Sequence, residues 1–163
     1  MSYYAGIDPG VTGSIAFYNG VELKIHDLPT NKRSFHTHKI RQQIDAEKLA
    51  DIFRLQECKF VMLENVHSQK GDGHVGAFTF GKTVGIIEGV LGTLNIPVIT
   101  IEPSVWKPQL GLNSQKEKSL VLARQKFPLY THYFERKKDH NRAESALLAW
   151  IAYTKFGSKA LGY

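Results

Sequence analysis

The sequence has few of the features that mark several large classes of protein. It holds a single cysteine, Cys58, among 163 residues, which excludes an internal disulfide and a cysteine-rich zinc site. It contains no unbroken run of about eighteen apolar residues and no early apolar segment followed by a cleavage site. We therefore expect no membrane partner and a location in the cytoplasm.

Acidic residues are scarce relative to basic ones. The chain carries 21 Lys and Arg against 15 Asp and Glu, a formal charge of +6. This surplus favours an anionic partner, and nucleic acid before membrane, because no strongly amphipathic basic helix stands out. With 42% hydrophobic residues and no linker or internal repeat, the chain is expected to fold as one domain over residues 1–163.

The hydrophobic pattern predicts an α/β fold. Pro9-Gly10 separates the first two strands, and Asn19-Gly20, a strong hairpin signal, leads into a third. Further strands are predicted near 59–64 and 96–103, the second of them buried, and helices at 44–53, 77–94, 114–127 and 139–156. This order predicts a mixed five-stranded sheet, its first three strands antiparallel, flanked by helices. The polar and basic residues 28–43 are expected to form an irregular loop.

Acidic residues stand at three places where a strand or helix meets one end of this sheet. Asp8 ends the first strand and Glu64 ends the fourth. Asp139, His140 and Glu144 open the last helix, where His140 and Glu144, four residues apart, share a face. Oxygen ligands with one imidazole suit Mg²⁺ or Mn²⁺. Two such ions about 3.5–4 Å apart can activate water and stabilise a leaving oxygen in phosphodiester cleavage.

Each of these residues also has a simpler structural explanation. An Asp such as Asp8 before Pro9-Gly10 suits turn initiation, and a glutamate at a strand end is often just solvated. Asp139 can cap the last helix by binding backbone amides. The combination of the three acidic places with the basic surplus nevertheless favours a two-metal nuclease site.

Three motifs resemble the RuvC-type Holliday junction resolvases of the ribonuclease H-like superfamily, closest to the phage and RuvC-like branch. They are Gly6-Ile7-Asp8-Pro9-Gly10 with Thr12-Gly13, Leu63-Glu64, and Asp139-His140-x-x-Ala143-Glu144-x-x-Leu147. Pro103-Ser104-Val105-Trp106-Lys107 and Lys118 extend the match over most of the chain. The resemblance implies a homodimer, in a bacterial or phage-infected cell, that makes paired symmetric nicks in four-way DNA junctions with Mg²⁺ or Mn²⁺.

The resemblance also implies how the carboxylates share two ions. Asp8 would match the first-strand aspartate that bridges the metals, and Glu64 the second carboxylate. One ion, held by Asp8 with His140 and Glu144, would orient and deprotonate water. The other, held by Asp8 and Glu64, would stabilise the departing 3′ oxygen.

The C-terminal helix departs from the family pattern at one ligand. Glu144 matches the second helix ligand, but its partner three residues earlier is Asn141, a poor ligand. His140 and Asp139 lie one and two residues further back. Helical facing favours His140, with Asp139 either coordinating the metal or orienting His140.

Several residues are expected to contact DNA or the second subunit. Lys107 and Lys118 match family positions near the scissile phosphate, and His67 stands where bacterial members place an aromatic wedge. The further candidates for phosphate contacts come from two basic segments and are Lys32, Arg33, Lys137 and Lys138. By analogy, residues 78–94 would form the dimer helix, although its glycines suit packing on the sheet equally.

Three other functions remain open from the sequence. Sugar kinases and actin-like ATPases share an Asp-x-Gly loop after a strand, but 163 residues cannot hold their two domains, so no nucleotide cofactor is expected. A related nuclease acting on other branched DNA or on RNA would have the same motifs. A non-catalytic junction-binding protein would keep the fold, but the intact acids at all three motif positions argue against it.

Overall fold

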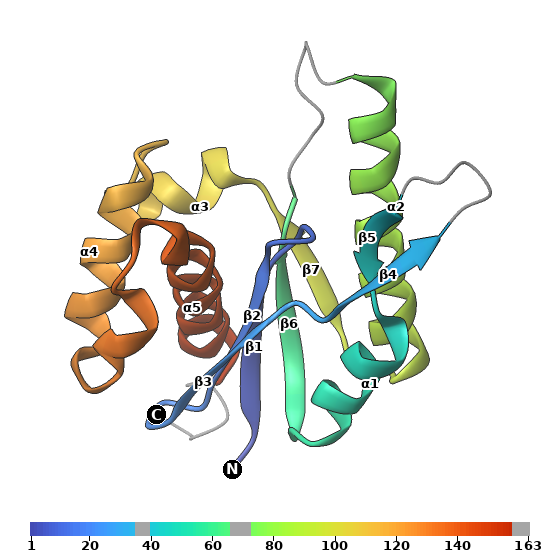
Figure 1. Ribbon diagram of the computed structural model, residues 1–163. Coiled ribbons are helices and arrows are strands. Elements are labelled where there is room, and N and C mark those ends of the chain that lie inside the picture. Colours follow the sequence, from blue (N-terminus) through green and yellow to red (C-terminus); the bar gives the residue numbers. More distant parts are fainter. Residues whose placement is uncertain (35–39, 66–72, 158–163) are drawn as a thin grey trace.

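A central five-stranded sheet organises the computed structural model, which describes residues 1–34, 40–65 and 73–157 (Figure 1). The strand order is β3-β2-β1-β6-β7. The bounds are β1 Tyr3–Asp8, β2 Ser14–Tyr18, β3 Leu23–Asp27, β6 Cys58–Glu64 and β7 Val98–Ile101. Strand β2 is antiparallel to β1 and β3, whereas β6 is parallel to β1 and β7. The predicted mixed sheet is confirmed.

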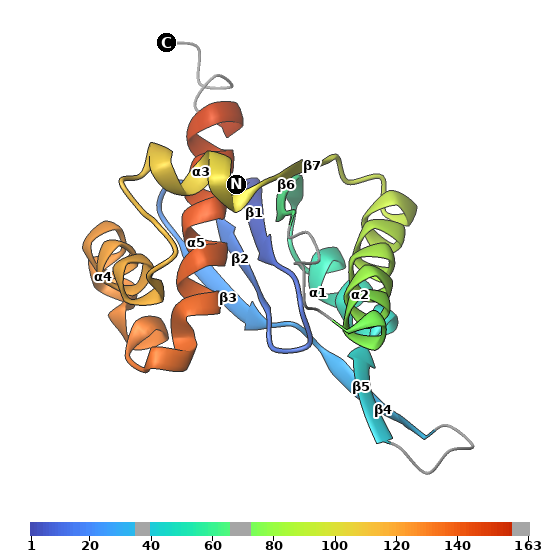
Figure 2. The same cartoon turned by 90° about the horizontal axis from the view of Figure 1, so that it is seen from above.

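Helices cover both faces of the sheet in two separate groups, as Figure 2 shows from above. On one face lie α1 (Ala46–Arg54) and α2 (His74–Thr93). On the other lie α3 (Pro103–Gln109), α4 (Lys116–Lys126) and α5 (His140–Ala152). Two 3₁₀ turns, Pro128–Phe134 and Lys137–Asp139, join α4 to α5, and a π-helical turn, Tyr153–Gly157, follows α5.

Strand β1 is buried on both faces because helices cover each of them. Successive side chains of a strand point to opposite faces, so Ala5 and Ile7 enter the core formed with α1 and α2. Gly6 faces α5 instead. A Cβ atom on Gly6 would lie 2.2 Å from the carbonyl oxygen of Ser145 and 2.4 Å from the backbone nitrogen of Ala149. Helix α5 is therefore seated directly on the strand that ends in Asp8.

Residues 28–43, predicted to be an irregular loop, instead contain a hairpin. Strands β4 (Thr30–Ser34) and β5 (Ile40–Ile44) pair antiparallel as a separate two-stranded sheet that projects beyond the main sheet (Figure 2). Backbone pairing holds this hairpin, and its largely polar strands lack the apolar alternation that marks a half-buried strand. That is why its sequence gave no strand signal.

The predicted strand near 96–103 is also less buried than expected. Strand β7 lies at the edge of the sheet, and Ile99 is 45% exposed. An edge strand pairs on one side only, so an apolar run there does not require full burial. Its apolar sequence resembled that of a central strand.

Among the described residues, α2 is long and apolar enough to cross a membrane by length and composition. Only 17% of its most apolar window is buried. The sequence contains no unbroken apolar run there because threonine, glycine and charged residues interrupt it. Helix α2 is therefore unusually apolar for a helix with so much exposed surface.

The contact between β1 and α5 can be tested with a single methyl group. We expect Gly6→Ala to lower the free energy of unfolding by about 3 kcal/mol or more, because the new Cβ would meet backbone atoms that cannot rotate away. Gly92→Ala in α2 is the control, since its Cβ would meet open space and alanine favours a helix over glycine. Thermal unfolding of both variants measures this. Equal stability of Gly6→Ala and the unmodified protein would contradict the contact.

Candidate metal centre

Two of the predicted ligands lie side by side because their strands are parallel neighbours. Ile7 of β1 is paired with Leu63 of β6, so the next residues, Asp8 and Glu64, leave the sheet at the same edge. Parallel strands in register also share their alternation between faces. Gly6 and Met62 face the α5 side, and two residues further along each strand the same face carries a carboxylate.

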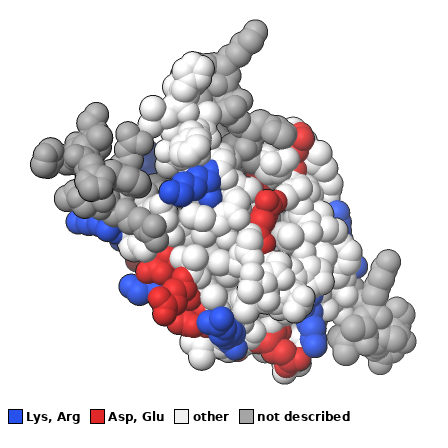
Figure 3. All heavy atoms as spheres, turned by 90° about the vertical axis from the view of Figure 1, so that its right-hand side faces the viewer, with Lys and Arg blue, Asp and Glu red and all other residues white. Residues whose placement is uncertain are grey.

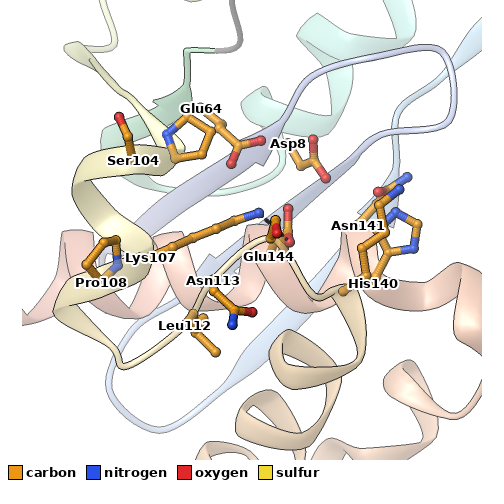
Figure 4. Close-up of a pocket in the computed structure, with 13 residues that line it drawn as sticks. Asp8, Glu64, Ser104, Lys107, Pro108, Leu112, Asn113, His140, Asn141 and Glu144 are labelled. Carbon is orange, nitrogen blue, oxygen red and sulfur yellow. Dashed lines mark hydrogen bonds and ion pairs between the residues drawn. The ribbon is translucent and has the colours of Figure 1, made fainter.

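Glu144 of α5, one turn after the start of that helix, completes the carboxylate group. One carboxylate oxygen from each of Asp8, Glu64 and Glu144 lies within 4.8 Å of the others. The three residues are 8%, 4% and 5% exposed. Figure 4 shows their carboxylates at a pocket of about 660 Å³ that is also lined by Lys107, His140 and Asn141. The structure thus brings together three of the five predicted metal ligands.

Neighbouring carboxylates disfavour the negative charges of Asp8 and Glu64. Burial, followed by the charges of Glu64 and Glu144, raises the pKa of Asp8 well above its ordinary value. Burial and the charge of Glu144 raise the pKa of Glu64 to about 6, although Lys107 and the Trp106 N–H act in the opposite direction. A divalent cation would relieve this repulsion, and hard oxygen donors are the ligands that Mg²⁺ and Mn²⁺ prefer. The residues therefore fit a divalent cation.

Two lysines supply positive charge to the same pocket. The Lys107 ammonium lies 2.8 Å from Glu144 Oε1, and its side chain is only 15% exposed. Lys116 lines the pocket, and its charge lowers the pKa of Asp8. The site therefore combines clustered acids with two cations from α3 and α4, a mixture suited to a substrate that carries phosphate.

His140 lines this pocket but lies outside the group of three carboxylates. Its Nδ1 is 3.0 Å from the carbonyl oxygen of Lys137. A carbonyl can only accept a hydrogen bond, so Nδ1 carries a proton and, in the neutral ring, Nε2 keeps its lone pair. This is the tautomer of a metal-binding histidine whose second nitrogen is held by the protein.

Asp139 lies apart from the carboxylate group. Its carboxylate accepts hydrogen bonds from the side chain and backbone N–H of Arg136, with distances of 2.8–3.2 Å, and faces Arg142 at 3.7 Å. Burial raises the pKa of Asp139, but the hydrogen bonds from Arg136 outweigh it and the net shift is downward. The ring of His140 is held by the carbonyl oxygen of Lys137 and not by Asp139. The structure thus gives Asp139 an ion-pairing role.

The first turn of α5 is tied to the strands that it covers. Arg142 donates two hydrogen bonds to the Asp27 carboxylate, at 2.7 and 2.6 Å. The Asn141 side chain donates to the carbonyl oxygen of Thr12 at 2.7 Å, and Ser14 Oγ donates to the carbonyl oxygen of Asn141 at 2.8 Å. These bonds hold the first turn of α5, which directly precedes Glu144, against β3 and the β1–β2 turn.

Lys116 of α4, and not the predicted Lys118, lines the pocket of the carboxylates. Lys118 lines a separate groove between α3 and α4 with Leu110 and Val121. Lys116 lies two residues earlier, about 200° around the helix, and faces the carboxylates. The sequence singled out Lys118 by its match to the family motif, and such a match does not show which lysine of α4 (Lys116–Lys126) faces the carboxylates.

The other predicted DNA contacts are spread around the pocket. Lys137 and Lys138 are exposed, and Lys138 lines a second pocket beside the first. Lys32 is exposed on β4, where Arg33 is paired with Arg41 in the hairpin register. His67 lies outside the described residues. Trp106 and Ser119, which sequence reasoning did not single out as site residues, each donate a hydrogen bond to a glutamate of the carboxylate group.

Comparison with known proteins supports the resemblance. Thermus thermophilus RuvC in complex with a Holliday junction substrate superposes with a TM-score of 0.64 at 14% identity, covering 97% of this chain and 98% of that one. A second T. thermophilus RuvC structure gives a TM-score of 0.58 at 15% identity, covering 94% and 95%. The chain therefore has the RuvC fold, as predicted.

A curated relative matches part of the sequence. Holliday junction resolvase MOC1, chloroplastic, from Chlamydomonas reinhardtii is 37% identical over 81 residues, which are 48% of this chain. The chain covers only 9% of the length of that relative. No family model matches the sequence.

The raised pKa of Glu64 predicts a pH dependence of stability without metal. An acid with a folded pKa of about 6 contributes stability below its ordinary value near 4.5, and loses it as pH rises through 6. We expect Glu64→Gln to match the unmodified protein at pH 4.5 and to exceed its free energy of unfolding by about 2 kcal/mol at pH 7. Urea denaturation in EDTA measures the difference, with Glu135→Gln, an exposed site, as control. A difference that does not change with pH would contradict the argument.

Proposed function

We propose that this chain is a structure-specific endonuclease that makes paired nicks in four-way DNA junctions by metal-dependent hydrolysis. The observation that carries the proposal is the buried group of Asp8, Glu64 and Glu144 at one edge of a RuvC-fold sheet. The names of the relatives support the choice of substrate, since one is called a Holliday junction resolvase and another binds a Holliday junction.

In the proposed mechanism, the chain holds a divalent centre and aligns the phosphodiester beside it. Two ions, Mg²⁺ or Mn²⁺, would supply Lewis acidity and activate water. Asp8, Glu64 and Glu144 would hold them, with Nε2 of His140 as a further ligand. No covalent nucleophile from the protein is required. Without DNA, Lys107 pairs with Glu144; when DNA binds, this pairing would give way to a contact between Lys107 and the scissile phosphate.

The DNA strand is proposed to leave this pocket toward the hairpin. The second pocket shares His140 and Asn141 with the first, and it continues to Lys138 and to the base of the β4–β5 hairpin at Thr30 and Gln42. Lys32 is paired with Gln42 in the hairpin register, and Arg33 follows it along β4. This arrangement would neutralise phosphates on one side of the cut, so binding should weaken as salt rises.

A homodimer would supply the second active site that symmetric cleavage requires, and α2 is the proposed contact. Figure 3 shows that the face carrying α2 is largely uncharged. Phe78 is 73% exposed and Val75 58%. A Cβ on Gly81 or Gly85 would meet no atom within 4 Å in the described chain. The sheet is therefore not the partner of these glycines, and a second copy of α2 is free to approach them.

Two alternatives differ from this proposal in substrate or chemistry. A related nuclease on other branched DNA or on RNA would share the carboxylate group, and a junction-binding protein without activity would share the basic surface. Cytoplasmic location, in a bacterial or phage-infected cell, belongs to the proposal as well. The algal relative is named as chloroplastic.

The dimer contact can be tested at its most exposed aromatic residue. We expect the unmodified protein to have the mass of two chains in light scattering and Phe78→Glu to have the mass of one, because a buried unpaired charge opposes association. Leu129→Glu is the matched control, since Leu129 is 84% exposed outside α2. A monomeric unmodified protein, or a dimeric Phe78→Glu variant, would contradict a contact through α2.

Cleavage itself can be tested at Asp8. Asp8→Asn should cut a labelled four-way junction more than about 100-fold more slowly. Removing a residue that only holds a metal ligand in place costs about 10–100-fold, and Asp8 is proposed to bind the metal directly. Its junction binding should be equal or tighter, because one negative charge facing the phosphates is lost. The measurements are nicking in Mg²⁺ and gel-shift binding in EDTA, with a linear duplex and an RNA/DNA hybrid beside the junction.

The controls in this experiment separate the alternatives. Paired, metal-dependent nicking of the junction alone supports the proposal. Equal cutting of the hybrid would favour a broader nuclease, and binding of the junction without any cutting would favour the non-catalytic protein. Loss of both folding and binding in Asp8→Asn would show that Asp8 is structural.

A further inference from the structure

The two glutamates of the metal centre are each held on one oxygen by a buried donor. Trp106 Nε1 donates to Glu64 Oε1 at 3.1 Å, and Ser119 Oγ donates to Glu144 Oε1 at 3.1 Å. Both donors are fully buried. They come from α3 and α4, two helices that contribute no carboxylate to the group.

These donors are fixed by the packing around them. Trp106 belongs to a buried cluster with Met62, Leu112 and Leu147, which joins α3 to the sheet and to α5. Ser119 precedes Leu120, whose side chain packs into the core between α4 and α5. Neither donor can follow a glutamate that turns toward solvent without disturbing that packing.

A bond to one oxygen limits the orientations available to the whole carboxylate. A glutamate side chain has three rotatable bonds, and ordering it costs up to about 2 kcal/mol. Trp106 and Ser119 occupy Oε1 of their glutamates, which leaves Oε2 of each glutamate for a cation. The ordering cost is then met when the protein folds and not when the cation binds.

We propose that Trp106 and Ser119 are positioning residues that hold Glu64 and Glu144 in the orientation required for a divalent cation, and so set the affinity of the site. The inference rests on the proposed function, because it takes the carboxylate group to be a metal site. It gives α3 and α4 a role in metal binding that can be measured without cleavage, in addition to the lysines that they would supply to the substrate.

The two donors should differ in their effect. Glu144 Oε1 also receives Lys107 Nζ at 2.8 Å, so it retains one donor when the Ser119 hydroxyl is removed. Glu64 has the Trp106 N–H as a donor and a hydrogen bond with Asp8, but a bond between two carboxyl groups needs a proton that a bound cation would displace. Removal of the indole N–H should therefore weaken metal binding more than removal of the hydroxyl.

The test measures the affinity of the metal-free protein for Mn²⁺ by isothermal titration at pH 8, above the pKa of Glu64. Trp106→Phe should bind Mn²⁺ about tenfold more weakly, within the range for partners of metal ligands. Ser119→Ala should show a smaller loss in the same direction. Circular dichroism confirms that each variant is folded, and Ser119→Ala keeps the test available should Trp106→Phe not fold.

Matched controls remove the same groups elsewhere on the α5 side of the sheet. Trp150→Phe removes an indole that stacks with Lys126, and Ser145→Ala removes a buried hydroxyl bonded to Ser14. Both should bind Mn²⁺ within about twofold of the unmodified protein. Controls that lose as much affinity as Trp106→Phe and Ser119→Ala would overturn the inference, since general loosening would then explain the effect.

The outcomes also separate this inference from the proposed function. In one outcome, the unmodified protein binds Mn²⁺ and cuts junctions, and the folded Trp106→Phe and Ser119→Ala variants bind Mn²⁺ with the same affinity. That result would overturn the inference alone. An unmodified protein that binds Mn²⁺, with weaker binding in both variants, but that cuts no junction would support the inference and overturn the proposed function. An unmodified protein that binds no Mn²⁺ would overturn both.

Discussion

Repulsion among three buried carboxylates is the constraint on which the rest of the site depends. Asp8, Glu64 and Glu144 lie within 4.8 Å of one another through their oxygens, and each is less than a tenth exposed. Such a group is costly unless protons, lysines or a cation balance its charge. The raised pKa values of Asp8 and Glu64 express that cost. A protein that keeps this arrangement sacrifices stability for binding or chemistry at the site.

The scaffold holds these groups together against their repulsion. Helix α5 lies so close to β1 that Gly6 has no room for a side chain, and the Arg142–Asp27 pair ties its first turn to β3. Two adjacent parallel strands then present Asp8 and Glu64 on the face toward that helix. Donors from α3 and α4 complete the site from the other side. Stability lost at the carboxylates is therefore offset by packing beneath them.

The sequence predicted the parts of the site that depend only on which residues end the strands. Asp8 and Glu64 each end an apolar strand, and parallel pairing brings such residues together without further information. Asp139 and Lys118 could not be placed that way, because one turn of helix decides whether a side chain faces a cavity or a neighbouring arginine. The β4–β5 hairpin escaped prediction because backbone pairing, and not apolar alternation, holds it. Trp106 and Ser119 depend on contacts between distant segments, which one-dimensional periodicity does not encode.

The central claim is that the carboxylate group binds divalent metal. Anomalous diffraction from crystals soaked in Mn²⁺ tests this most directly, because the scattering identifies the ion and its position independently of activity. The account predicts strong peaks between the carboxylates of Asp8, Glu64 and Glu144, within about 2–2.5 Å of their oxygens. Peaks only at other surface acids, or none at saturating Mn²⁺, would contradict it.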